Sequence, residues 1–174
     1  MHSATELKEK IHQAQESGDI ASLYVLESSA QEIFDEESLG EFYTYILDMA
    51  LERLTDTLES HRKMDLSEVQ DFATARALYE YAMEHYSADQ KSDASALFEV
   101  LSGISSDERF SLALKFHYMA ADEGMSLDDF LYTMADLEET QKNGTFYISA
   151  FTKEAQSLLD EIEAKSMGKK EFHT

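Results

Sequence analysis

The histidines and carboxylates of this 174-residue chain are its candidates for metal binding and acid–base catalysis. Glu9 and His12 have the Glu-x-x-His spacing found in carboxylate-bridged diiron bundles. Such a centre needs a second Glu-x-x-His pair and two more inward-facing glutamates, and no other histidine of this chain follows a glutamate by three residues. With no cysteine, the chain also lacks thiolate ligands. We therefore expect no metal site.

His117 stands between Phe116 and Tyr118 and has two interpretations. It is either a neutral, hydrogen-bonded packing residue or a functional one, a ligand or a catalytic base, and the functional interpretation lacks a partner residue in the sequence. The chain contains no glycine-rich phosphate loop, no Gly-x-Ser-x-Gly, no His-Glu-x-x-His and no EF-hand loop. We expect no catalytic residue, no cofactor and no enzymatic activity.

Acidic residues dominate the composition, with 36 Asp and Glu against 14 Lys and Arg and a net charge of −22. Direct nucleic-acid binding is not expected, because it requires clustered basic residues. Residues 27–60 hold ten acids and one base, Arg53, and residues 116–141 hold seven acids and no base. These stretches are either a solvated surface or a face that attracts a basic partner, and both interpretations stay open.

The N-terminal residues, MHSATELKEK, contain no apolar stretch of the kind that a signal peptide needs. No apolar run approaches the length of a membrane span. We expect a cytoplasmic protein that does not enter a membrane.

The composition predicts an all-α fold, because the chain has no proline and only six glycines. We expect about eight antiparallel helices joined by short turns, as one domain over residues 1–165 with a frayed tail over 166–174. Thr5 and Asp19 are expected to cap the first two helices. The expected helices cover residues 5–17, 19–34, 38–60, 66–86, 87–102 and 106–124, with a seventh from Ser126 and an eighth after Gly144.

Two of these helices raise particular expectations. The helix over 38–60 has one stripe with Leu51 and Leu58 and an adjoining one with Phe42 and Ile46, so we expect it to be central. The region after Asn143-Gly144 has a competing interpretation, because residues 146–150 alternate as in a strand that would pair with residues 131–134. The helical spacing on both sides is longer, so we favour helix and no significant β-sheet.

Two segments of the chain are similar at an offset of 38 residues, 75–84 and 113–122. The stretch LALKFHYMAADEG, residues 112–124, resembles the second helix of a Sel1-like repeat, a relative of the tetratricopeptide repeat. The positions that match this pattern are Ala113, Phe116, His117, Ala120, Ala121 and Gly124. The resemblance covers residues 67–124 and implies helical-hairpin packing that is partly repeat-like and binds another protein in a groove. The alternative is that small residues recur in any tightly packed pair of helices.

The sequence therefore predicts a protein-interaction module, either an adaptor or a partner-specific chaperone. Its partner is another protein, basic or presenting a helix or extended peptide, and self-association is left open. Exposed aromatic residues are favoured at interfaces, and the expected groove residues are Tyr79, Tyr81, Phe116, His117 and Tyr118. The alternative function is an acidic decoy that occupies a nucleic-acid-binding protein by imitating phosphate charge.

Overall fold

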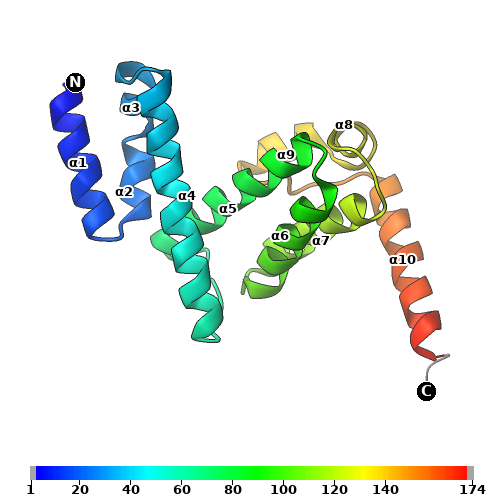
Figure 1. Cartoon of the computed structure of the whole chain (residues 1–174). Helices are drawn as coiled ribbons and strands as arrows, with labels where there is room; N and C mark the ends of the chain where they lie inside the picture. Colours follow the sequence, from blue (N-terminus) through cyan, green and yellow to red (C-terminus); the bar gives the residue numbers. More distant parts are fainter. Residues whose placement is uncertain (1–2, 172–174) are drawn as a thin grey trace. The chain divides into compact units, whose positions relative to one another are not determined.

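The computed structural model describes the backbone of residues 3–171 and the side chains of residues 3–167. Within this part of the chain the fold is all-α, with ten α-helices, one π-helical turn and two isolated β-bridges in place of a sheet (Figure 1). The elements are α1 (Ala4–Glu16), α2 (Ile20–Val25), α3 (Glu27–Ile33), α4 (Glu36–Glu59), α5 (Val69–Ser87), α6 (Lys91–Ile104), α7 (Glu108–Asp122), α8 (Leu127–Asp129), η1 (Phe130–Met134), α9 (Leu137–Asn143) and α10 (Lys153–Glu171).

The chain packs as two compact units. Unit 1 comprises residues 1–81 and 104–107, and unit 2 comprises residues 82–103 and 108–174. The expected single domain over residues 1–165 stays a prediction. α10 continues to Glu171, so part of the tail that we expected to fray is helical, and residues 172–174 lie outside the described residues.

Unit 1 is built from α1, α2, α3, α4 and the first part of α5, with α2 lying between α1 and α4 (Figure 1). Asp19 caps α2 as expected, since its carboxylate accepts the Ser22 N–H at 3.0 Å. Ser3, not Thr5, caps α1 by accepting the Glu6 N–H. The helix expected over residues 19–34 is interrupted at Leu26, where α2 ends and α3 begins.

A buried carboxylate fixes the connector between α4 and α5. The side chain of Asp71 is 3% exposed, and its Oδ1 lies 3.1 Å from Nη2 of Arg53 on α4. Its Oδ2 accepts the backbone N–H of Asp65 at 3.0 Å. Met64 in the same connector donates its N–H to the Ile104 carbonyl and accepts the Ser106 N–H. These bonds tie residues 104–107 into unit 1.

The core of unit 2 is an aromatic cluster between α6, α7 and the segments that follow. Phe98 and Phe130 are fully buried and contribute large apolar side chains. Tyr86 is also buried, and its hydroxyl donates to the Met125 carbonyl at 2.8 Å. α6 and α7 are joined by reciprocal bonds in which the hydroxyls of Ser102 and Ser111 each donate to the other residue's carbonyl, at 2.6 and 2.7 Å.

The region after α7 differs most from the sequence-based expectation. Ser126 begins a helix as expected, accepting the Asp129 N–H, but only three α-helical residues precede η1. The prediction that a helix begins soon after Gly144 is wrong, because α10 begins at Lys153. Residues 145–152 instead form an irregular segment beside residues 134–136, with a bridge between Ala135 and Phe151. The alternative prediction, an extended segment paired with residues 131–134, is closer to the structure, since that region ends one residue before the bridge at Ala135.

Candidate functional site

The five residues expected to line a groove fall into two groups by burial. Tyr79, Phe116 and His117 are 4%, 3% and 0% exposed, so a partner on the outside of this conformation does not reach them. Tyr81 and Tyr118 are half-buried and present part of their rings to solvent. All five lie on α5 or α7, and three of them belong to the core. Tyr118 is the residue that leads to a groove.

His117 is a core residue in this structure. Its Nδ1 lies 2.7 Å from the Ala113 carbonyl, one turn earlier on α7. Its ring lies 5.0 Å from the ring of Phe98 and 5.0 Å from that of Phe130. Burial lowers the pKa of His117 to about 4, although the hydrogen bond to Ala113 opposes this shift. A neutral imidazole with Nδ1–H as a donor fits these surroundings, in agreement with the packing interpretation.

An apolar groove of about 450 Å³ lies between α7 and α10 of unit 2. Met119 and Leu159, each 4% exposed, form its floor. Tyr118 and Ile162 are half-buried along its sides, and Met167 is 65% exposed at one end. We name this feature the α7/α10 groove. Its size is within the range of sites that bind ligands or peptide side chains.

The two walls of the groove have the same helical spacing. α7 contributes residues 115, 118, 119, 122 and 123, and α10 contributes residues 159, 162, 163, 166 and 167. Both sets follow the i, i+3, i+4, i+7, i+8 pattern that places residues on one face of a helix. The groove therefore runs between two rows of side chains, one on a single face of each helix.

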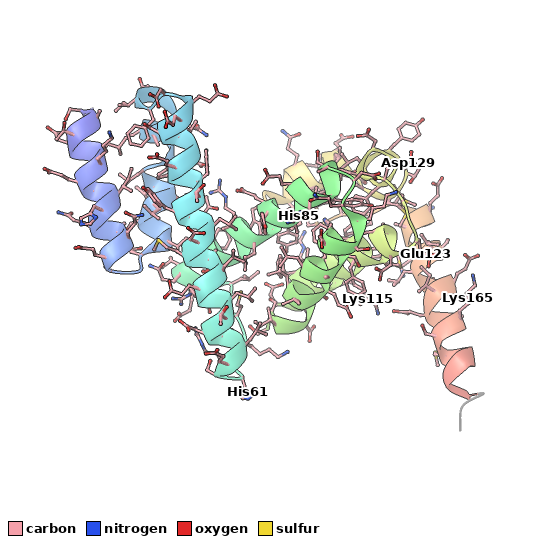
Figure 2. The ribbon with its side chains drawn as sticks, in the orientation of Figure 1. His61, His85, Lys115, Glu123, Asp129 and Lys165 are labelled. Atoms are coloured by element: carbon pink, nitrogen blue, oxygen red, sulfur yellow. The ribbon has the colours of Figure 1, made fainter. Side chains whose placement is uncertain are left out.

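Charged groups surround the apolar floor. The Lys115 ammonium pairs with the Glu163 carboxylate at 2.5 Å and joins α7 to α10. The Ser95 hydroxyl on α6 donates to Asp122. Figure 2 labels Lys115 and Glu123 on α7, and Lys165 on α10. Three acids and one base line the groove, so its charged residues sum to −2.

The phenol of Tyr118 remains protonated near neutral pH. Burial raises the pKa of Tyr118, and the nearby carboxylates of Glu99, Asp122 and Glu163 raise it further, while Lys115 opposes them. A protonated phenol supplies an apolar ring with a hydrogen-bonding end. The groove thus combines the aromatic ring of Tyr118 with an acidic rim.

The α10 wall was missed although its signal was visible. Leu159 and Ile162 are three residues apart and belong to the apolar stripe of the last helix. Their spacing indicated burial, but it did not indicate that α7 would cover only one side of the stripe. Met167 fell within the tail that we expected to fray.

A second apolar hollow of about 280 Å³ lies between α2 and α5 in unit 1. Val25 and Val69 are exposed there by 81% and 69%. Its one cationic side chain, Arg76, lies 4.1 Å above the Tyr24 ring and already pairs with Glu27 and Glu80. The charge at this hollow is therefore largely satisfied within the unit.

The described residues contain no group of three or more histidines and carboxylates placed to hold a metal ion. His12 pairs with Glu16, 3.0 Å away, one turn later on α1. None of the helices in residues 3–171 combines the length and the apolar character needed to cross a membrane.

The comparisons with known proteins add no family. No protein-family model matches the chain, and neither a curated protein nor a solved structure matches it.

Proposed function

We propose that this chain is a non-enzymatic protein-interaction module, an adaptor or partner-specific chaperone, that binds a segment of another protein in the α7/α10 groove. The observation that supports this function is the accessible apolar surface of the groove, presented by half-buried Tyr118 and Ile162 and exposed Met167, beside a rim of net negative charge. Apolar surface provides the free energy of binding, and the acids favour a basic partner and speed its approach.

The proposal includes helical-hairpin packing that is partly repeat-like. The two similar segments lie in α5 and α7, and their small residues Ala75, Ala82, Ala113 and Ala120 are all buried. Bonds between α6 and α7 support a hairpin, since Ser102 pairs with Ser111 while Ser95 pairs with Asp122 at the other ends of these helices. Helical-hairpin arrays commonly use their surfaces to bind peptides.

The test compares two substitutions that bring the same charge to partly or largely exposed apolar positions. Ile162→Glu places a carboxylate in the groove, and Leu112→Glu places one on α7 at a residue that is 50% exposed and does not line the groove. Tagged wild-type and variant chains are incubated with extract of the source cells and washed at low and high salt. We expect a stoichiometric partner that survives high salt on wild type and on Leu112→Glu, and is lost on Ile162→Glu. Equal capture by all three would remove the groove from the proposal.

A second candidate function, the acidic decoy, is favoured by one observation on α4. Six exposed acids share one face of this helix over about 33 Å, from the first turn to the last. They are Glu37, Glu41, Asp48, Glu52, Asp56 and Glu59. Their average spacing of about 6–7 Å is close to twice the axial spacing of phosphates along one DNA strand.

This acidic face reduces the stability of its own helix. Like charges four residues apart, such as Asp48 with Glu52 and Glu52 with Asp56, destabilise a helix by about 0.2–0.5 kcal/mol per pair. Acids in the last turn also oppose the helix dipole, and the last turn of α4 contains no basic residue. A surface that costs stability without an evident structural benefit is a reason to look for function.

The decoy is tested with Asp48→Asn/Glu52→Gln/Asp56→Asn and a charge-matched control, Glu138→Gln/Glu139→Gln/Glu161→Gln, at exposed positions of unit 2. We expect the α4 variant alone to lose a basic, DNA-binding partner that wild type releases as salt rises. Equal retention by both variants would exclude the α4 face as a decoy surface.

A further inference from the structure

We infer that the occupant of the α7/α10 groove is an amphipathic α-helix that carries a lysine or arginine where it meets Glu123. This inference rests on the proposed function and narrows the partner to one conformation and one charge pattern. Three features support it: both walls are α-helices, their side chains are spaced at helical intervals, and carboxylates without a basic partner in the groove lie at one end.

The walls favour a helix over an extended peptide. An extended peptide is usually held by backbone hydrogen bonds to a sheet edge, and here both walls are α-helices whose backbone groups are paired within the helix. An extended peptide on this floor would lose water from its own N–H and C=O groups without gaining partners. A helix pairs these groups internally and presents only side chains.

The spacing of the walls suits a third helix. The side chains at 118, 119 and 122 on α7 and at 159, 162 and 166 on α10 form two rows at helical intervals. Ridges of a third helix fit between such rows, as in other helix packings. Residues 115 and 123 are about 12 Å apart along α7, so about eight residues of the occupant would contact the groove.

The charge pattern places the occupant's cation near one end. At the Lys115 end, the ion pair with Glu163 balances the charge. At the other end, α7 terminates at Asp122, and the carboxylates of Asp122 and Glu123 lie at the negative end of its dipole. Both residues are exposed, and Figure 2 shows Glu123 at this end of α7. A lysine or arginine of the occupant is favoured there.

The uncovered stripe of α10 supports the same occupant. Ala155 and Leu159 are buried, but all described residues beyond Leu159 are exposed except Ile162, which is half-buried. The second half of α10 leaves the rest of unit 2 (Figure 1). A helical segment of about three turns with few tertiary contacts is marginal by itself, and an apolar face laid on Ile162 and Met167 would stabilise it.

The experiment selects binders from a random library of peptides of about 16 residues displayed on phage, a length that can form a helix on binding. Wild-type chain is the bait, and each enriched peptide is then measured as a free peptide against wild type, Ile162→Glu, Leu112→Glu and Glu123→Gln. A proline is placed at the centre of each peptide as the conformational control.

The expected peptides have apolar residues at i, i+3 or i+4, and i+7, together with a lysine or arginine. They should bind at least tenfold more weakly to Ile162→Glu but not to Leu112→Glu, and lose binding with the central proline. Glu123→Gln should weaken them about two- to fivefold, with the loss fading at high salt.

The outcomes separate the inference from the function on which it rests. Groove-dependent peptides with alternating apolar residues that tolerate proline would overturn the helix and leave the interaction module standing. Helical peptides that ignore Glu123→Gln would overturn the position of the cation. Peptides that bind Ile162→Glu as well as wild type, or no enriched peptides at all, would overturn the proposed function itself.

Discussion

Protonation of His117 should make the protein less stable as the pH falls from 7.5 to 4.5. The imidazole is fully buried between the rings of Phe98 and Phe130, and burial lowers its pKa from 6.5 to about 4. The unfolded chain therefore takes up a proton near pH 6.5 that the folded chain refuses until about pH 4. The stabilisation is complete above the unfolded pKa and decreases as the pH falls through this window.

The magnitude follows from the size of the shift. One pKa unit corresponds to about 1.4 kcal/mol, so the full effect is about 3 kcal/mol, of which about 2.5 kcal/mol is lost by pH 4.5. This is a large part of the stability of a typical domain, about 5–15 kcal/mol. Carboxylates that gain protons over the same range also change stability, so a reference variant is needed.

The reference is His117→Leu, which leaves an apolar side chain in the aromatic cluster without a titrating group. Urea unfolding followed by circular dichroism gives the free energy of unfolding for both chains at several pH values. The advantage of wild type over His117→Leu should shrink by about 2.5 kcal/mol between pH 7.5 and 4.5. His117→Gln serves in its place if the leucine variant does not fold, and His61→Asn, at an exposed position, controls for the loss of a histidine. A difference that stays constant with pH would refute the reasoning, because His117 would then not be held neutral by burial.

Three further outcomes test the local structure. Asp71→Ala should lower the free energy of unfolding by about 3 kcal/mol, because Arg53 and the Asp65 N–H lose a buried acceptor, and a loss under about 0.5 kcal/mol in a denaturation curve would contradict this role. Gly144→Ala should lower the free energy of unfolding by about 1 kcal/mol, because Gly144 has a φ of 66°. Gly40→Ala, inside α4, should instead raise the free energy of unfolding by about 0.5–1 kcal/mol. An added Cβ meets no atom within 4 Å at either site, so equal effects of the two substitutions would contradict the backbone explanation. Asp48→Asn/Glu52→Gln/Asp56→Asn should raise the melting temperature in low salt by relieving repulsion along α4, and an unchanged melting temperature would show that these charges do not interact.

The sequence was sufficient for the fold class and for several helix boundaries, because these depend on local chemistry. Asp19 was identified as a cap and Ser126 as the start of a helix from their side chains and the apolar residues that follow them. The break at Leu26 was not predictable, since no glycine or proline marks it and the apolar spacing continues across it. Glu27, just after the break, pairs with Arg76, which lies 49 residues away. Such long-range contacts are invisible to a local pattern.

The apolar stripes gave the right residue types but only part of the burial. On α4, Phe42 and Ile46 are buried as expected, but Leu51 and Leu58 are 36% and 49% exposed. Periodicity identifies a helix face that can be buried, and the number of neighbouring elements decides how much of that face is buried. The same reason explains why Tyr79 and Phe116 are buried while Tyr118 reaches the groove.

The segment after α9 shows how side chains outside a repeating pattern can decide between helix and extended structure. Gly144 ends α9 in the left-handed conformation, and the Thr140 hydroxyl then accepts the N–H groups of Ser149 and Ala150. With those donors occupied, residues 145–152 run back beside Ala135, and α10 begins only at Lys153.

The later start of α10 matters for the groove. With α10 starting at Lys153, buried Leu159 lines the groove together with Met119, while Ile162 is half-buried and Met167 is exposed. The start of α10 is therefore set by a segment that does not line the groove, in which Thr152 also donates its N–H to the Met134 carbonyl and its hydroxyl to the Thr133 carbonyl.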